Sequence, residues 1–298
     1  MSTRGCVQPP ARPESARALS RALVLTLVFA GAEVAGGLLS RSLALLADAA
    51  HMVTDVGALG LSLFVLWMAR RPATAAKSFG YWRLEILAAL GNGALLVVVT
   101  VWIVIEAVRR LGAPPAIRSG LMLGVALAGL AANLAAVALL HRARDENLNT
   151  RGAYLHVLGD ALGSLGTIAA AAVILATGWL LADPLIAFGI AALILFSAVR
   201  LVRESADVLL EGTPKSVSLP DLHAAIGAVP GVADVHDLHV WTVSNGIVAM
   251  SAHATVADPA RHQGALEEIC RRVRTFGIQH VTIQMEEDPA WHGGESGR

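Results

Sequence analysis

Long apolar runs separated by short polar segments make up the first two thirds of the chain. Stretches of at least about 18 apolar residues, enough to cross the hydrocarbon layer of a bilayer as a helix, recur along it. They begin at Leu19, Leu43, Leu84, Leu121, Tyr154 and Pro184. This pattern predicts six membrane-spanning helices.

After about Arg203 the pattern changes to short alternating segments with turn signals. "SLPDLHAAIGAV" predicts a short helix with Ser218 as its N-cap. "VADVHDLHVWTVS" and "IVAMSAHATV" alternate on either side of Asn245-Gly246, which is typical of a β-hairpin. A helix within Pro259–Phe276 and the strand "HVTIQME" follow. We therefore expect a small α+β domain in which helices cover one face of an antiparallel sheet, and we expect the uncovered face to favour dimerisation.

The composition agrees with a membrane protein. Of the 298 residues, 55% are hydrophobic and 15% are charged, whereas a soluble domain has roughly 25% charged residues. Because the first apolar run is long and follows a polar segment that contains prolines, we interpret the N-terminus as retained rather than as a signal peptide. The expected organisation is a disordered cytoplasmic tail (1–18), a six-helix transmembrane domain (19–204), a cytoplasmic domain (205–290) and a flexible tail (291–298).

Basic residues are distributed unequally between the two ends of the predicted helices. Most of them precede the first run or lie between the second and third runs or between the fourth and fifth. These are Arg4, Arg12, Arg17, Arg21, Arg70, Arg71, Lys77, Arg83, Arg142, Arg144 and Arg151. The positive-inside rule therefore predicts that both termini face the cytoplasm. The two cysteines, Cys6 and Cys270, support neither a disulfide framework nor a cysteine-rich metal site.

Acidic residues and histidines interrupt two of the apolar runs. An Asp at the centre of a spanning helix costs about 2.5 to 3.5 kcal/mol on the insertion scale. Some interaction or function must therefore offset the cost of Asp48 and Asp55. With His51 they fall within about 60° of one another around a helix, so they share one stripe. Such a stripe can hold helices together by hydrogen bonds. The fifth run, however, repeats the His-x-x-x-Asp spacing with His156 and Asp160 among small residues.

The repeat favours a metal site. Each pair places one imidazole nitrogen and one carboxylate oxygen on adjacent turns, and two such helices offer a tetrahedral set suited to Zn²⁺. Because zinc binds neutral imidazole and ionised carboxylate, loading the site releases protons and emptying it takes them up. We hypothesise that zinc leaves the cell in exchange for protons. Glu33, Asn92 and Asn133 are other polar residues within the spans, and each either lines the cation path or makes an interhelical hydrogen bond.

Several stretches resemble the signature sequences of the cation diffusion facilitators, in particular the zinc-type branch. They are "SLALLADAAHMVTD", "FGYWRLEILAAL", "RGAYLHVLGDALGS" and "VHDLHVWTV", and the resemblance runs from about Arg21 to Glu287. It implies a homodimeric metal/proton antiporter of the plasma (inner) membrane, with six transmembrane helices and a cytoplasmic ferredoxin-like domain. It also implies that the transport site consists of His51, Asp55, His156 and Asp160. A histidine at position 51, rather than an aspartate, implies a preference for zinc.

The resemblance extends to the cytoplasmic domain. It implies that His236, His253 and His262 contribute to regulatory zinc sites near the dimer interface. Glu286 stands where some members of the family use another ligand. Strand alternation predicts that His239 points to the opposite face from His236, so His239 is left out of this site.

Three further charged residues receive supporting roles. Asp48 is not needed for tetrahedral zinc, so we assign it to supporting the ligands or to a proton path. Arg83 and Glu211 match positions that form a charge lock between helices 3 and 6 in the family. Two solvated charges beside the membrane are the alternative.

Two functions of other classes remain as alternatives: a membrane metal sensor that binds without transporting, and a membrane-embedded zinc enzyme. Against an enzyme, the sequence has no His-Glu-x-x-His motif, and four protein ligands leave no open coordination position. We therefore expect that the protein is not an enzyme. We also expect no nucleic acid among its partners. The expected partners are a second copy of the chain, the bilayer, protons and Zn²⁺, both as cargo and as a regulatory ligand. The ligand types do not choose between zinc, cadmium, cobalt and iron.

Overall fold

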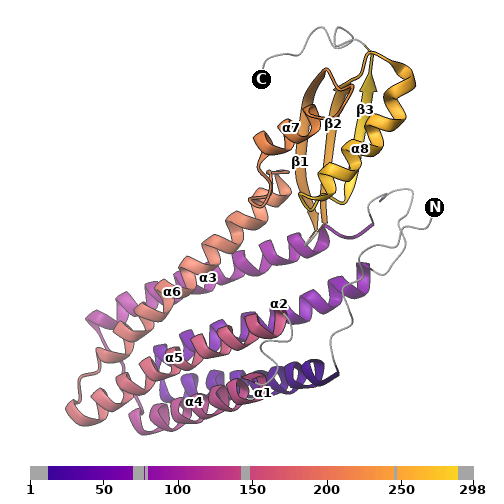
Figure 1. Cartoon of the computed structure of the whole chain (residues 1–298). Coiled ribbons are helices and arrows are strands. Elements are labelled where there is room, and N and C mark those ends of the chain that lie inside the picture. Colours follow the sequence, from indigo (N-terminus) through magenta and orange to yellow (C-terminus); the bar gives the residue numbers. More distant parts are fainter. Residues whose placement is uncertain (1–12, 70–76, 78–79, 142–147, 245–246, 288–298) are drawn as a thin grey trace. The chain divides into compact units, whose positions relative to one another are not determined.

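The computed structural model describes residues 13–69, 77, 80–141, 148–244 and 247–287. Part of the predicted N-terminal tail (1–12), the end of the predicted cytoplasmic domain (288–290), the whole predicted C-terminal tail (291–298) and the Asn245-Gly246 turn lie outside the described residues. Six long helices come first (Figure 1). They are α1 (Pro13–Ser40), α2 (Leu43–Ala69), α3 (Leu84–Gly112), α4 (Ser119–His141), α5 (Leu148–Thr177) and α6 (Ala182–Leu209). Each coincides with one predicted apolar run.

The lengths and compositions of these helices confirm a helical membrane domain. Counting described residues only, α3, α4, α5 and α6 are each long and apolar enough to cross a membrane. The described apolar parts of α1 and α2 are shorter, Val24–Ser40 and Leu43–Thr54. Many large apolar side chains on these helices are exposed in the isolated chain, as expected of surfaces that face lipid.

Small residues bring the membrane helices close together. α4 packs along both α1 and α5, and buried alanines recur in the core between the helices. At Gly129 of α4, an added Cβ would lie 2.7 Å from Phe29 Cε1 and 2.9 Å from Glu33 Oε1 on α1. Only glycine permits this approach, which agrees with the use of small residues where helices pack in lipid.

A buried carboxylate anchors the start of α2. Asp183, in the first turn of α6, accepts hydrogen bonds from Ser42 Oγ at 2.5 Å, Leu43 N at 2.8 Å and Ala44 N at 3.1 Å. Arg110 Nη1, near the end of α3, lies 3.8 Å from Asp183 Oδ2. The carboxylate satisfies N–H groups that have no partner within α2 and suits the positive end of the helix dipole. One residue therefore ties α2 to α6 and α3.

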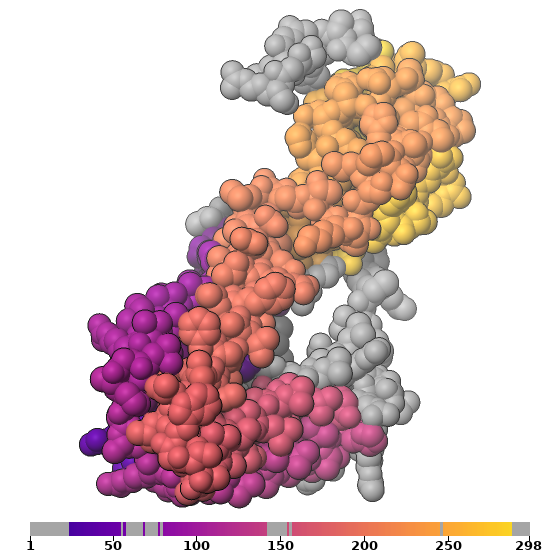
Figure 2. All heavy atoms as spheres, turned by 90° about the vertical axis from the view of Figure 1, so that its left-hand side faces the viewer, coloured from indigo at the N-terminus to yellow at the C-terminus, as the bar shows by residue number. Residues whose placement is uncertain are grey.

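The C-terminal domain has the predicted order of elements. It contains α7 (Leu219–Gly227), β1 (Asp234–Ser244), β2 (Ile247–Thr255), the short 3-10 helix η1 (Pro259–Arg261), α8 (His262–Arg274) and β3 (His280–Glu286). Ser218 caps α7 as predicted, because its side chain accepts from Asp221 N. Figure 2 draws the atoms of this domain as spheres, coloured orange to yellow.

The sheet of this domain is mixed rather than antiparallel. Its order is β1-β2-β3, with β1 antiparallel to β2 and β2 parallel to β3. The prediction of an antiparallel sheet is wrong for β3, because α8 connects β2 to β3 and allows the chain to return in the same direction. α7 and α8 contact each other, and they contact β1 and β3 respectively. The apolar core lies between these helices and the sheet.

The alternation along β1 is interrupted in "HDLH". His236 pairs with His253, but His239 pairs with Ser251, so three steps on β1 match two on β2. Asp237 lies within this bulge at φ 49°, a left-handed conformation that Asp tolerates better than most residues. Since directly paired residues share a face, His239 lies on the same face as His236. The prediction that the two histidines point to opposite faces is therefore wrong.

Candidate metal centres

The predicted transport ligands lie on α2 and α5. His51 Nε2 is 3.9 Å from Asp160 Oδ1 across the two helices, and the Asp160 side chain is 4% exposed. Neighbouring ligand atoms around a tetrahedral zinc ion are roughly 3.4 Å apart, because metal–ligand bonds are about 2.0 to 2.2 Å long. The pair thus stands slightly wider than an occupied zinc site. The side chains of Asp55 and His156, one turn away on the same helices, lie outside the described residues.

A cavity of about 560 Å³ opens beside this pair, between α2, α5 and α6. Its polar lining includes Asp48, His51 and Asp160. α5 contributes Gly159, Gly163 and Gly166, and α6 contributes Gly189. Because these glycines have no side chains, they leave room for an ion and its water next to the ligands.

Asp48 is held against α5 by a hydrogen-bonded chain. Its carboxylate is hydrogen-bonded to the Ser164 side chain, and Ser164 Oγ accepts from Asn133 Nδ2 of α4 at 3.2 Å. A Cβ on Gly163 would lie 3.1 Å from Asp48 Oδ1, so glycine allows the carboxylate to come this close. Of the two roles open to Asn133, the structure contains the interhelical hydrogen bond.

Glu33 is a further buried acid near the predicted transport ligands. Its side chain is completely buried on α1. Neither of its carboxylate oxygens has a hydrogen-bond partner among the described residues. Asp48 and Asp160 are close enough to repel a negative charge on it. Acidic side chains gathered in this way make the interior favourable for a divalent cation, which offsets their mutual repulsion.

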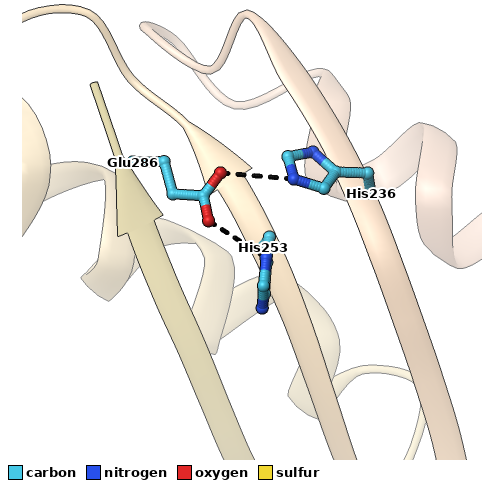
Figure 3. Close-up of side chains that lie close together, drawn as sticks. All are labelled: His236, His253 and Glu286. Atoms are coloured by element: carbon cyan, nitrogen blue, oxygen red, sulfur yellow. Dashed lines mark ion pairs between the residues drawn. The ribbon is translucent and has the colours of Figure 1, made fainter. Parts of the chain in front are cut away.

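A second group of ligands lies on the three strands of the C-terminal domain (Figure 3). His236 on β1, His253 on β2 and Glu286 on β3 offer ligand atoms that all lie within 4.8 Å of one another. His236 Nε2 is 3.2 Å from Glu286 Oε2, and His253 Nδ1 is 3.0 Å from Glu286 Oε1. These two histidine–glutamate spacings are close to the roughly 3.4 Å expected between ligand atoms around tetrahedral zinc. Two imidazoles and one carboxylate are also a donor set that zinc prefers.

This group lies on the face of the sheet that the helices leave uncovered. Ala252 and Ala254, which flank His253 in β2, belong to the core between the sheet and the helices. Since successive side chains of a strand point to opposite faces, His253 points away from that core. The ligand group therefore faces outward, on the side where we expect a second copy of the chain.

In each of the two histidines, the ring nitrogen that points away from Glu286 faces an aspartate carboxylate. His236 Nδ1 is 3.1 Å from Asp234 Oδ2, and His253 Nε2 is 3.6 Å from Asp237 Oδ2. His239 Nε2 lies 2.8 Å from Asp237 Oδ1. This hydrogen bond, together with the nearby histidines, holds the pKa of Asp237 below its usual value. The sequence analysis did not single out either aspartate. In "DVHDLH", Asp237 directly follows His236, and Asp234 precedes His236 with Val235 between them.

His262 is not in the described ligand group; its Nε2 lies 2.9 Å from the carbonyl oxygen of Val256. Arg83 Nη2 and Glu211 Oε1, just before α3 and just after α6, form an ion pair at 2.6 Å. Both of these side chains are exposed, at 43% and 57%.

Comparison with known proteins places this geometry in a family. Residues 19–210 match the model of the cation efflux transmembrane domain, and residues 214–288 match that of the cation efflux protein cytoplasmic domain. The chain is 45% identical to the zinc transporter ZitB of Escherichia coli over 282 residues, which is 94% of this chain and 90% of that protein. It is 43% identical to the metal cation efflux system protein CzcD of Cupriavidus metallidurans over 277 residues, which is 92% of this chain and 87% of that protein.

A third relative has an antiporter name. The chain is 40% identical to the cadmium, cobalt and zinc/H(+)-K(+) antiporter of Bacillus subtilis over 265 residues, which is 87% of this chain and 85% of that protein. Both family models and all three relatives agree with the resemblance that the motifs indicated. The chain belongs to the cation efflux family, the cation diffusion facilitators, and to its zinc-type branch.

Proposed function

We propose that this chain exports divalent metal cations, zinc foremost, from the cytoplasm in exchange for protons. The observation that carries the proposal is the meeting of His51 and Asp160 from two membrane helices beside a cavity. The names of its relatives, a zinc transporter and a cadmium, cobalt and zinc/H(+)-K(+) antiporter, support the same function.

The ligand chemistry couples metal to protons. Asp55 and His156 complete the transport site from the same two helices, giving two nitrogen and two oxygen ligands for zinc. Zinc displaces protons from the ligands when it enters from the cytoplasm, and protons from outside displace zinc when the site opens outward. Asp48, held by Ser164, supports the ligands and gives protons a place to bind beside them.

The arrangement in the membrane follows the same proposal. The chain is a multi-pass protein of the plasma (inner) membrane with both termini in the cytoplasm. Two copies associate through their cytoplasmic domains. Zinc at His236, His253 and Glu286 draws the two domains together and adjusts transport to the cytoplasmic zinc concentration. Arg83 and Glu211 form the charge lock beside α3 and α6.

A membrane metal sensor is the second candidate, because the C-terminal ligand group would also serve a protein that only reports zinc. A cavity and glycines beside the membrane ligands favour transport, since an ion that stays in place needs no path. A membrane-embedded zinc enzyme has less support, because the relatives are transporters and four protein ligands occupy the zinc.

Zinc flux measured together with internal pH in proteoliposomes tests the proposal. The wild-type chain is compared with Asp160→Ala, and Asp207→Ala, which changes an exposed acid on α6, is the matched control. We expect zinc movement that requires a proton gradient in the wild type and in Asp207→Ala, and none in Asp160→Ala. Zinc that binds the wild-type chain tightly but never crosses the membrane would contradict the proposal and favour the sensor.

A further inference from the structure

The two histidines of the C-terminal ligand group are both backed by an aspartate. His236 presents Nε2 to Glu286 at 3.2 Å and Nδ1 to Asp234 at 3.1 Å. His253 presents Nδ1 to Glu286 at 3.0 Å and Nε2 to Asp237 at 3.6 Å. In each ring, one nitrogen faces the ligand group and the other faces an outer carboxylate.

This arrangement has a defined chemical consequence. A neutral imidazole carries its proton on one nitrogen and its lone pair on the other. Carboxylates face both nitrogens of each ring, so a metal ion in the ligand group would take the inner lone pair, and the outer carboxylate would then accept the N–H of the other nitrogen. The outer carboxylate thereby favours the tautomer and the ring orientation in which the inner nitrogen binds the metal ion. His236 is thereby fixed as an Nε2 ligand, and His253 as an Nδ1 ligand.

The backbone places the second aspartate at a cost. Asp237 has φ 49° in the bulge of β1, a conformation that glycine adopts more readily than any other residue. The bulge turns Asp237 toward both His253 and His239, and His239 Nε2 holds its other oxygen at 2.8 Å. A regular strand would place Asp237 on the opposite face from His236 and His253. The bulge therefore places an aspartate, a residue that tolerates this conformation, beside a predicted ligand.

We propose that Asp234 and Asp237 are positioning residues of the cytoplasmic zinc site, each fixing the tautomer and orientation of one histidine ligand. The inference rests on the proposed binding of zinc at His236, His253 and Glu286. It also predicts a rank order. Asp234 is within hydrogen-bond distance of its histidine, whereas Asp237 is slightly beyond it and is shared with His239, so loss of Asp234 has the larger effect.

Zinc affinity of the full-length chain, measured in detergent by competition with a chromophoric chelator, tests this proposal. Asp160→Ala is included throughout, so that zinc in the membrane site does not contribute. We expect Asp234→Ala to weaken binding about tenfold and Asp237→Ala somewhat less, at the low end of the range for outer carboxylates because both are partly solvated. Asp221→Ala, an exposed aspartate on α7, is the matched control and leaves affinity unchanged.

Double substitutions separate positioning from a general structural role. Asp234 acts through His236, so Asp234→Ala should cost nothing further in a His236→Ala chain but its full effect in a His253→Ala chain; Asp237 should give the reverse pattern. Asp237→Gly relieves the backbone, so it should keep or raise the melting temperature while it still weakens zinc binding. A merely structural role would lower both quantities together.

These measurements separate the positioning role of the two aspartates from the proposed binding of zinc at the C-terminal ligand group. If zinc does not bind the Asp160→Ala chain, or binds unchanged after His236→Ala, the cytoplasmic site is wrong and the inference falls with it. If His236→Ala weakens binding but Asp234→Ala and Asp237→Ala do not, only the positioning role is overturned. Equal, additive losses in both histidine backgrounds would overturn it as well.

Discussion

The proposed membrane site and the proposed C-terminal site use the same ligand types in different surroundings. His51 and Asp160 stand 3.9 Å apart on two helices, next to a cavity and to further buried acids. In the C-terminal domain, His253 and His236 lie 3.0 and 3.2 Å from Glu286 on a hydrogen-bonded sheet. This difference fits the proposed roles, because a site that loads and releases an ion would benefit from wider spacing and free volume, whereas a site that reports zinc would benefit from ligands already in place.

The two regions also differ in what holds them together. The C-terminal domain has a continuous apolar core between its helices and its sheet. The membrane helices meet through small residues and through buried polar contacts such as that of Asp183 with the start of α2. Polar substitutions are therefore expected to matter more for stability in the membrane region than in the C-terminal domain.

The largest effect is expected from Asp183→Ala. It leaves Ser42 Oγ and two backbone N–H groups of α2 without their acceptor, and it leaves Arg110 beside an uncharged site. We expect a loss of about 3 kcal/mol in the free energy of unfolding, because buried groups lose charge-assisted hydrogen bonds. Thermal unfolding in detergent measures it, with the exposed Asp207→Ala on the same helix as control. Equal melting of the two variants would contradict the anchoring role.

Glu286→Gln tests the C-terminal site. Its carboxylate lies against both histidines, so its loss should weaken zinc binding by at least about a hundredfold, more than the loss of an outer partner. Zinc titration of the full chain carrying Asp160→Ala measures this. Glu287→Gln, the exposed neighbour in the sequence, is the control. An unchanged zinc affinity in Glu286→Gln would contradict the proposal that Glu286 is a zinc ligand.

Gly163→Ala and Gly159→Ala compare two glycines one turn apart on α5. A Cβ at Gly163 would press on Asp48 Oδ1 at 3.1 Å, whereas a Cβ at Gly159 meets nothing within 4 Å. We expect Gly163→Ala to raise the zinc concentration for half-maximal transport about threefold, because Asp48 must shift from the ligands that it supports. Gly159→Ala adds a methyl group to the cavity wall without touching Asp48, so it should raise this concentration less than Gly163→Ala does. The same shift in both variants would exclude an effect through Asp48.

The smallest effect is expected at the ion pair of Arg83 and Glu211. Both side chains are exposed, so water screens the attraction despite the 2.6 Å separation. A double-mutant cycle with Arg83→Ala and Glu211→Ala should give a coupling of about 0.5 kcal/mol in thermal unfolding. A coupling several times larger would mean that the pair is a lock that strongly stabilises the fold.

Local patterns predicted the elements of this protein well. Apolar runs gave the membrane helices because lipid leaves few other ways to satisfy the backbone, and Ser218 marked the start of α7. The repeated His-x-x-x-Asp spacing predicted four membrane ligands, and the described structure brings two of them, His51 and Asp160, to 3.9 Å across α2 and α5.

Features that depend on long-range geometry could not be predicted in this way. The direction of β3 depends on where α8 returns the chain. The face of His239 depends on a bulge that simple alternation ignores. Asp183 precedes a proline at the start of its own helix, where an aspartate suits the N-terminus, so nothing local indicated that it anchors α2 about 140 residues earlier.

Transport rate as a function of cytoplasmic zinc concentration tests the central claim most directly, that one site carries the ion and the other adjusts transport. It is measured in proteoliposomes for the wild type, Asp160→Ala and Glu286→Gln. We predict no transport at any concentration for Asp160→Ala. For Glu286→Gln we predict the wild-type maximal rate with its half-maximum at a higher zinc concentration. Transport by Asp160→Ala, or loss of maximal transport in a folded Glu286→Gln chain, would contradict this division between the sites.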